Sequence, residues 1–245
     1  QLELRLAAAM AGATLYLDAF AGRGPVEAHG ITGQAMFGEA YWTMPGAPTD
    51  RRKNGTSGSR FAAARDLAKR LCYSSLYGAG VSTVHSDLTS VEGGDGDLIY
   101  AHYTIRKVAA LHRRWLRNAP EFPKWWERTL EAWRKTGYIK DPVTKRRRDF
   151  SDGEDFNAIV NFPCQAGGWG IVSRGLLKLR ERIPFDYHDG TGLIAQTHDS
   201  VVYLCREDAA DEVAEIVEAC LYTEALGVAF TAESAVQKGW AEIKE

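Results

Sequence analysis

Residues 192–205 have the sequence GLIAQTHDSVVYLC, in which two short apolar runs, LIA and VVYL, flank the polar residues THDS. Short apolar runs on both sides of a polar turn predict a β-hairpin, with His198 and Asp199 near the turn. Another strand is predicted at residues 228–234, VAFTAES. Most of the remaining chain has helical patterning. Helices that interrupt a few antiparallel strands predict an α+β fold.

The segments around the hairpin are divided by helix-breaking residues. Residues 44–59, MPGAPTDRRKNGTSGS, are rich in Pro, Gly and Ser and predict an exposed loop, and residues 91–97, VEGGDGD, predict a turn. Residues 4–13 are predicted to run from the end of a strand into an Ala-rich helix. Helices are predicted over residues 60–77, 97–118, 123–137, 162–183 and 208–225.

The composition is that of a folded protein with segregated charge. A chain of 245 residues with 45% hydrophobic content can bury a full core, in one large domain or two intimate ones. Residues 103–148 contain fourteen Lys or Arg against four Asp or Glu, whereas residues 207–245 contain ten acidic residues against two basic ones. The basic segment is typical of a surface that faces a polyanion, although a pair of solvated helices would give the same pattern.

Two classes of protein are disfavoured. The four cysteines are scattered without a Cys-x-x-Cys pair, which is typical of a reducing compartment and argues against a zinc site or a disulfide scaffold. No apolar run approaches the length of a membrane span, so no membrane partner is expected.

The predicted helix at residues 60–77 carries an unusual stripe. Arg65, Lys69, Tyr73 and Tyr77 recur every four residues, so they lie along one side of the helix. Two cations on one face suit a polyphosphate, and aromatic rings further along suit a flat base. The alternative is an ordinary amphipathic helix whose basic side chains extend to solvent.

Two further patterns are candidates for function. A carboxylate such as Asp199 between apolar strands is costly without a charged partner, and Mg²⁺ is one such partner; Asp199 could instead cap its own turn. A hydrolase that uses Ser200 and His198 is disfavoured, because adjacent strand residues point to opposite faces and no Gly-x-Ser-x-Gly motif is present. Asn161 and Gln165, four apart at a predicted helix start, carry carboxamides that could contact groove edges of a duplex.

Taken in order, these segments resemble family A DNA polymerases, the bacterial DNA polymerase I type and its phage relatives. QLELRLAA resembles the first palm motif, VEAHGITGQAMFG the histidine segment, and RDLAKRLCYSSLYG the fingers-helix motif Arg-xxx-Lys-xxx-Phe/Tyr-xxx-Tyr-Gly. NFPCQ resembles the Asn-x-Pro-x-Gln stretch and QTHDS the His-Asp palm hairpin. TGYIKDPVTKRRRDF and ESAVQKGWAEIKE also resemble segments of the family, so the match spans nearly the whole chain with motif order kept.

The resemblance implies a palm, a small antiparallel sheet with helices, joined to mostly helical fingers. Residues 1–20 would be the first part of the palm, residues 21–156 the fingers, and residues 157–245 the second part of the palm with the catalytic hairpin. In the family, Asp-Tyr-Ser normally precedes the Gln of the first motif, whereas this sequence starts at that Gln. We therefore expect an upstream polymerase fragment, carrying the thumb and the first palm aspartate, as a partner.

The resemblance implies a metal and triphosphate site. Asp199 would bind two Mg²⁺ ions together with the aspartate expected three residues before Gln1. His29, Arg65 and Lys69 would hold the triphosphate of the dNTP. Lys69 could also protonate the leaving pyrophosphate as a general acid.

The resemblance also implies contacts to the sugar, the base and the DNA. Tyr73 would stack by the incoming base and sugar. Glu3, tied to Tyr77, would pack under the sugar and leave no room for a ribose 2′-hydroxyl. The residues expected at the primer–template are Asn161 and Gln165 on the minor-groove side and His198 at the primer end.

The chain departs from the family pattern in several places. Ser74 stands where a glycine is usual, Ser200 where a Glu is common, and Asn157 where an Arg is usual. QAGGWG, residues 165–170, replaces the usual Gln-Gly-Thr-Ala-Ala-Asp. These changes concern the expected contacts at the primer terminus.

The leading hypothesis is an enzyme part, the palm and fingers of a DNA polymerase in DNA replication, acting in the cytoplasm of a bacterium or a phage-infected host, or in an organelle. The alternative is a non-catalytic DNA-binding or assembly subunit derived from such a polymerase. The two hypotheses differ in whether an upstream fragment restores activity.

Overall fold

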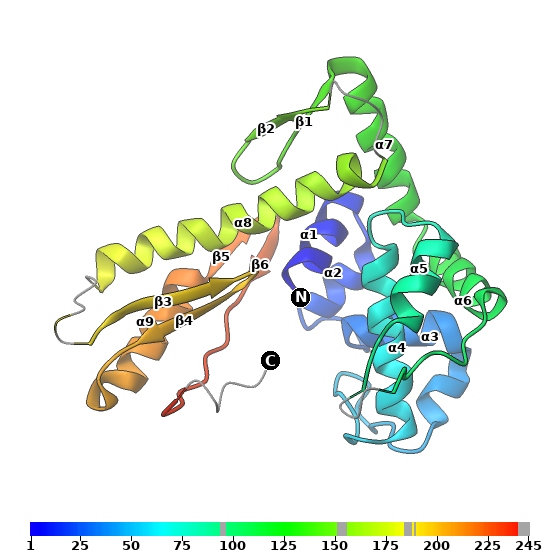
Figure 1. Cartoon of the computed structure of the whole chain (residues 1–245), viewed down its shortest axis with the longest axis horizontal. Coiled ribbons are helices and arrows are strands. Elements are labelled where there is room, and N and C mark those ends of the chain that lie inside the picture. Colours follow the sequence, from blue (N-terminus) through cyan, green and yellow to red (C-terminus); the bar gives the residue numbers. More distant parts are fainter. Residues whose placement is uncertain (94–96, 151–155, 184–187, 189, 240–245) are drawn as a thin grey trace.

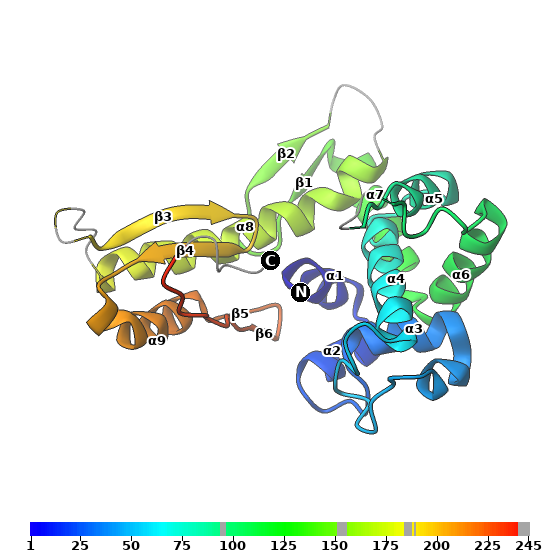
Figure 2. The ribbon, with the colours of Figure 1, turned by 60° about the horizontal axis from the view of Figure 1, so that its bottom comes forward.

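The computed structural model describes residues 1–93, 97–150, 156–183, 188 and 190–239 (Figure 1). Helices α1 (Leu2–Ala11) and α8 (Phe156–Arg182) lie in the middle of the molecule. On one side of them are the β3–β4 hairpin, α9 and the β5–β6 hairpin, and on the other side are α2 to α6 (Figures 1 and 2). No helix in the described ranges is long and apolar enough to cross a membrane.

Most of the elements in the described part of the chain are helices. The 3₁₀ helices are η1 (Gly38–Thr43) and η2 (Glu207–Ala209). The remaining helices are α2 (Thr14–Phe20), α3 (Ala28–Phe37), α4 (Arg60–Ser75), α5 (Val81–Thr89), α6 (Ile105–Asn118), α7 (Glu121–Thr136) and α9 (Ala210–Leu221). The strands are β1 (Tyr138–Lys140), β2 (Arg147–Asp149), β3 (Gly192–Thr197), β4 (Ser200–Leu204), β5 (Thr223–Ala225) and β6 (Val228–Phe230).

The predicted β-hairpin is confirmed. Strands β3 and β4 pair antiparallel, with Thr197 opposite Ser200, so that His198 and Asp199 form the two-residue turn. His198 has φ 51°, a left-handed conformation that tight hairpin turns require and that few residues other than glycine adopt. With two other antiparallel pairs, β1–β2 and β5–β6, and a majority of helix, the structure confirms the α+β class.

The main core lies where α1, α4, α6 and α7 meet. Leu4, Leu71 and Phe122 are buried in it, and Trp115 of α6 is fully enclosed. The indole of Trp115 donates to the Tyr16 hydroxyl at 3.0 Å, so the large ring is buried without an unsatisfied N–H. This core contains residues of both α1 and α4, and α4, which carries the predicted stripe, packs mainly on α3 and α5.

The strand predicted at the amino end is wrong, because the chain is helical from Leu2 onward. The buried residues Leu4, Ala8 and Ala11 recur at helical spacing, and alanine has the highest helix propensity. Gly12, with φ 74°, ends the helix in the left-handed conformation, and its N–H bonds to the Ala8 carbonyl. Because the buried face of α1 packs in the core, the position of this helix also determines where Glu3 lies.

Two predicted helix starts are also wrong. Helix α6 begins at Ile105 rather than at residue 97, because the Thr104 side chain caps it by accepting from the Lys107 N–H. Helix α8 begins at Phe156 rather than at residue 162, so Pro163 lies inside the helix and not at its start. Burial of Ile159 and Val160 stabilises this first part despite the hydrogen bond that proline removes.

The other predictions differ less from the structure. The helices expected at 60–77 and 123–137 are confirmed within a few residues as α4 and α7. The helix expected at 208–225 is confirmed as α9 only as far as Leu221, because Thr223–Ala225 form strand β5. Residues 44–59 form an irregular segment without α-helix or strand. The last strand covers only residues 228–230. The centre of the turn expected at 91–97, residues 94–96, lies outside the described residues.

The glycines of α8 have a packing role. A Cβ on Gly170 would lie 2.4 Å from Thr144 Cγ2, and one on Gly175 would lie 2.7 Å from Leu221 Cδ2. These distances are shorter than any real contact, so the neighbouring segments approach α8 more closely than alanine would permit. Gly170, which ends the QAGGWG stretch, therefore allows the segment between β1 and β2 to pack on the helix.

Candidate functional site

The Arg65 guanidinium on α4 is held by an acid from α3. Its Nε donates to Glu27 Oε1 at 2.9 Å, and both side chains are largely buried, at 18% and 15% exposed. Glu27 is also the N-cap of α3, where its Oε2 accepts from the His29 N–H at 2.8 Å. One carboxylate therefore fixes the start of α3 and the predicted phosphate-binding arginine together.

His29 is buried among positive charge. It is 3% exposed, and its Nδ1 has no hydrogen-bond partner in the described part of the chain. Burial, followed by the positive charges of Arg65 and Lys69, lowers the pKa of His29 to about 3, so the ring is neutral at pH 7. The ring centroid lies 5.9 Å from that of Tyr73. The structure thus brings together four predicted residues from two segments of the chain, which are His29, Arg65, Lys69 and Tyr73. Of these, Lys69 is exposed.

Glu3 joins three elements at the other end of α4. The Tyr77 hydroxyl donates to Glu3 Oε2 at 2.9 Å, which confirms the predicted contact between these two residues. The Gln165 amide on α8 donates to Glu3 Oε1 at 2.6 Å. Burial, together with the nearby Glu3 carboxylate, raises the pKa of Tyr77 well above its usual range, so the phenol remains a donor.

Asp199 lies in the hairpin turn with its side chain 51% exposed, next to the start of α1. Its Oδ2 is 3.9 Å from the Gln1 amino group. The expectation of a carboxylate buried between apolar strands is therefore wrong, since the two-residue turn lifts Asp199 out of the hairpin surface. Mg²⁺ usually takes one or two carboxylates plus substrate phosphates, and an exposed Asp is accessible for such a role.

No cluster of three or more His, Cys, Asp or Glu residues suited to a metal occurs among the described residues. Asp199 therefore has no neighbouring set of such residues, within the described ranges, that would complete a metal cage. The Ser200 hydroxyl donates to the Thr197 carbonyl at 2.9 Å, within the turn, and gives no support to a hydrolase.

The remaining predicted residues are less closely tied to this group. Asn161 lies one turn before Gln165 on α8, inside the helix and not at its start, and its Oδ1 is buried without a hydrogen-bond partner in the described ranges. His198 is exposed beside Asp199 in the turn.

Glu27 was missed by the sequence analysis. An acid two residues before His29 at a helix start is an N-cap signal, but nothing in the sequence indicates that Arg65, thirty-eight residues later, shares it. The arrangement as a whole contains two cations and a polar ring that could bind a polyanion. It also contains aromatic side chains and an exposed carboxylate. It could hold a phosphorylated ligand with a flat group.

Comparisons with known proteins identify relatives of this chain. A family model described as DNA polymerase family A matches residues 1–242. DNA polymerase I of Aquifex aeolicus (strain VF5) is 24% identical over 223 residues, which cover 91% of this chain and 34% of that protein. The POL domain of Pol1 from M. smegmatis, in complex with DNA primer-template and dNTP, has a TM-score of 0.66 at 16% identity and shares the fold, covering 90% of this chain and 35% of that chain. The chain spans about a third of the length of both.

Proposed function

Because the chain belongs to DNA polymerase family A, we propose that it supplies the palm and fingers for template-directed DNA synthesis. In this reaction a primer 3′-hydroxyl attacks the α-phosphate of a dNTP and pyrophosphate leaves. Primer–template DNA and dNTP are thus the proposed partners. The observation that carries the proposal is the convergence of His29, Arg65 and Lys69 beside Tyr73.

The triphosphate site is proposed on α4. Arg65 presents a guanidinium whose position Glu27 fixes, so Arg65 is a binding residue and Glu27 a positioning residue. Lys69, exposed one turn later, binds as a point charge and can give its proton to the leaving pyrophosphate. His29 is neutral and buried, so it contributes a hydrogen bond and not a charge.

The sugar and base are proposed to lie between Tyr73 and Glu3. The carboxylate of Glu3 is anchored by Tyr77 and by Gln165, which supports a rigid floor under the sugar. A rigid floor excludes a ribose 2′-hydroxyl better than a mobile one would. Since Gln165 contacts Glu3, it would link the floor under the sugar to the minor groove of the DNA. Asn161 would contact the minor groove beside it, and His198 would lie at the primer end.

Asp199 is proposed to hold the catalytic metals. Two Mg²⁺ ions would supply Lewis-acid activation of the primer hydroxyl and charge stabilisation of the leaving group. One carboxylate is too few for such a pair. We therefore propose that a second aspartate comes from an upstream segment outside this sequence, together with the thumb.

The domain division follows from this assignment. Residues 1–20 and 157–245 would form the palm and residues 21–156 the fingers. Helix α1, α8 and the β3–β4 hairpin then lie in the palm and α4 in the fingers, so the proposed active site is at their junction. The Tyr77–Glu3 pair would cross that junction, whereas the Glu3–Gln165 pair would join the two parts of the palm.

Primer extension tests the proposal. We expect the 245-residue chain alone to bind DNA weakly and salt-dependently and to extend no primer. Addition of the upstream polypeptide, with Asp-Tyr-Ser at its end, should restore Mg²⁺-dependent extension. Robust extension by the chain alone would contradict the requirement for a second aspartate. DNA binding without extension in the combined sample would favour the non-catalytic subunit.

A further inference from the structure

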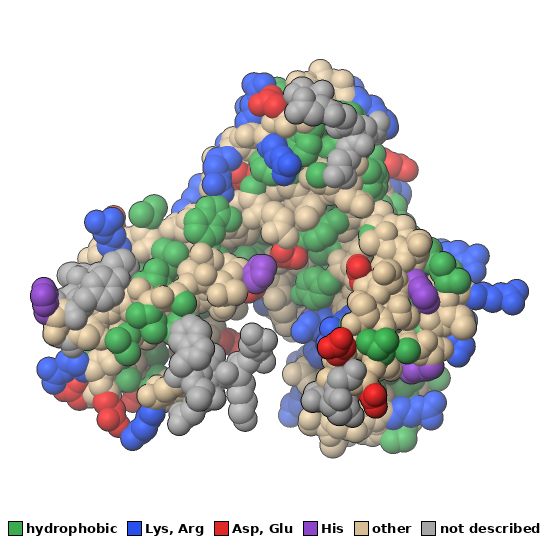
Figure 3. Space-filling view, in the orientation of Figure 1, with side chains coloured by type: hydrophobic (Ala, Val, Ile, Leu, Met, Phe, Trp, Pro, Cys, Tyr) green, Lys and Arg blue, Asp and Glu red, His purple; other side chains and the backbone are tan. Residues whose placement is uncertain are grey.

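Helix α6 and the loop before it carry strong positive charge. Residues 98–118 contain five Lys or Arg and no Asp or Glu. The side chains of all five are exposed: Arg106, Lys107, Arg113, Arg114 and Arg117. Lys and Arg side chains project from the edge of the molecule where Figure 1 draws α6 (Figure 3). None of these residues belongs to the site on α4.

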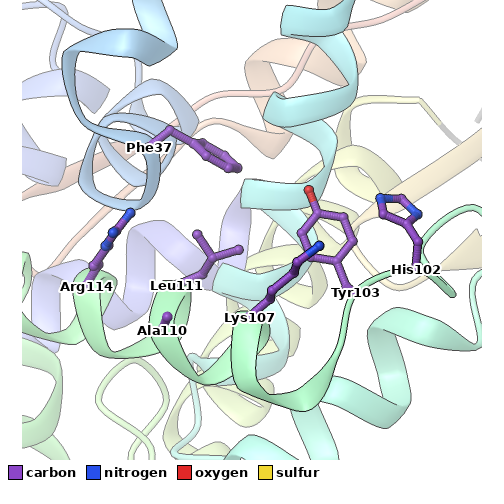
Figure 4. A pocket seen from close by; sticks show the side chains of 7 residues that line it. All are labelled: Phe37, His102, Tyr103, Lys107, Ala110, Leu111 and Arg114. Atoms are coloured by element: carbon purple, nitrogen blue, oxygen red, sulfur yellow. The ribbon is translucent and has the colours of Figure 1, made fainter.

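An apolar cavity of about 360 Å³ opens among these cations. Figure 4 shows the rings of Phe37, from the end of α3, and Tyr103, from the loop before α6, at two corners of the pocket, with Leu111 at the third. Lys107 and Arg114, one on each side of Leu111 along α6, bring charge to its rim. The volume lies within the range of small-molecule pockets, so it is large enough for a nucleobase.

The cavity walls are held in place by hydrogen bonds. The Tyr103 carbonyl lies 3.0 Å from His85 Nε2 of α5, and the Tyr103 N–H donates to the Tyr100 carbonyl at 2.9 Å. Arg114 NH1 donates to the Met36 carbonyl at 2.9 Å, beside Phe37. The Lys107 Nζ lies 5.9 Å from the centroid of the Tyr103 ring. Little ordering is therefore needed when a ligand enters.

We propose that this pocket binds the unpaired part of a nucleic-acid template, with one unstacked base between Phe37 and Tyr103 and flanking phosphates on Lys107 and Arg114. Aromatic faces next to phosphate-binding cations are the usual means of holding single strands without sequence preference. A paired base cannot enter, because its face is covered by its neighbours in the duplex. That the strand is a template rests on the proposed function; that the pocket holds a single strand does not.

Anisotropy of a fluorescein-labelled dT₁₂ oligonucleotide, with the intact 245-residue chain, tests the proposal. Lys107→Gln should weaken binding about fivefold and lower the salt slope by about one phosphate contact. Arg113→Gln is the matched control, because it removes a charge from the same helix outside the pocket; its Nε bonds only the Ala109 carbonyl of its own helix among the contacts described. Tyr103→Leu should weaken dT₁₂ binding about tenfold and leave a twelve-residue abasic oligonucleotide unaffected.

Three results would overturn the proposal. They are absence of dT₁₂ binding, equal losses in Lys107→Gln and Arg113→Gln, and equal losses for dT₁₂ and the abasic strand in Tyr103→Leu. A blunt duplex of the same length should compete poorly, and strong competition that the pocket variants abolish would also overturn it. Circular dichroism of each variant checks that the fold is kept. Failure of primer extension alone, with dT₁₂ binding intact, would count against the proposed function and not against this pocket.

Discussion

The α4 face and the β3–β4 turn carry the two halves of the proposed site, and they are built differently. On the α4 face, His29, Arg65 and Glu27 are largely buried and joined by hydrogen bonds. In the turn, Asp199 is half exposed and lies beside Gln1 at the start of α1. The proposed anion-binding groups are thus largely held in place by the protein, whereas the side chain of the proposed metal ligand is much less restrained.

The largest expected effect comes from the exposed half. Asp199→Asn in the combined complex should lower primer extension by about a thousandfold or more, because it removes a metal ligand without changing shape. Steady-state extension at saturating Mg²⁺ measures it. Asp208→Asn, an exposed acid paired with Arg206, is the control and should be neutral. Full activity in Asp199→Asn would contradict the metal assignment.

A smaller effect is expected from the buried half. Glu27→Gln keeps an acceptor for the His29 N–H but loses the ion pair to Arg65, so kcat/KM for dNTP should fall about tenfold. The loss of Arg65 orientation should outweigh the gain in binding from the more positive potential around it. The effect should appear mainly as a higher KM for dNTP. Glu39→Gln removes the acid of the exposed pair with Arg51 and serves as the control. An unchanged KM in Glu27→Gln, with an unchanged melting temperature, would show that Arg65 needs no positioning.

Tyr73 tests the same face at the sugar. A tyrosine hydroxyl can occupy the space that a missing 3′-hydroxyl leaves, so Tyr73→Phe should lower incorporation of dideoxy terminators relative to dNTP about tenfold. Competitive incorporation in the combined complex measures the ratio. Equal ratios in the two proteins would rule out this role.

Glu3 lies between the two halves. Glu3→Ala should raise ribonucleotide incorporation relative to dNTP severalfold by removing the floor under the sugar. Total activity should also fall, because Tyr77 and Gln165 lose their acceptor. Single-turnover incorporation of rNTP and dNTP separates the two effects. Rejection of ribonucleotides as strong as in the wild type would show that another residue is the gate.

The smallest effect concerns stability. The folded-state pKa of His29, about 3, lies below its ordinary value of 6.5, so the unfolded chain binds more protons between these values. The stability contribution of neutral His29 is therefore complete above pH 6.5 and is lost as the pH falls toward 3. From pH 7.5 to 6 the loss should be about 0.8 kcal/mol.

Urea unfolding at both pH values measures that loss. His29→Gln should show a correspondingly weaker dependence on pH. Burial also lowers the pKa of His112, so this second histidine leaves a residual slope in both proteins. An equal pH dependence of the wild type and His29→Gln would contradict the assigned pKa.

Local patterns in the sequence were sufficient for the hairpin and for α4. In the hairpin, two apolar runs and a polar turn specify pairing between neighbouring residues, and α4 has a Ser59 cap and a periodic stripe. The starts of α1 and α6 were misplaced although local signals, the Ala-rich helical spacing and the Thr104 cap, were present. The start of α8 was misplaced because burial of Ile159 and Val160 against distant residues outweighed the proline position.

By itself the sequence determined the fold class, the family and the residue types of the site, since these follow from motif order and local periodicity. Only the tertiary structure decided which residues meet. It joined Glu27 to Arg65, Gln165 to Glu3, and Phe37 to Tyr103 around a pocket. The physical reason is that periodicity specifies which face of a helix is apolar, whereas the partner of that face depends on how all the helices pack around one core.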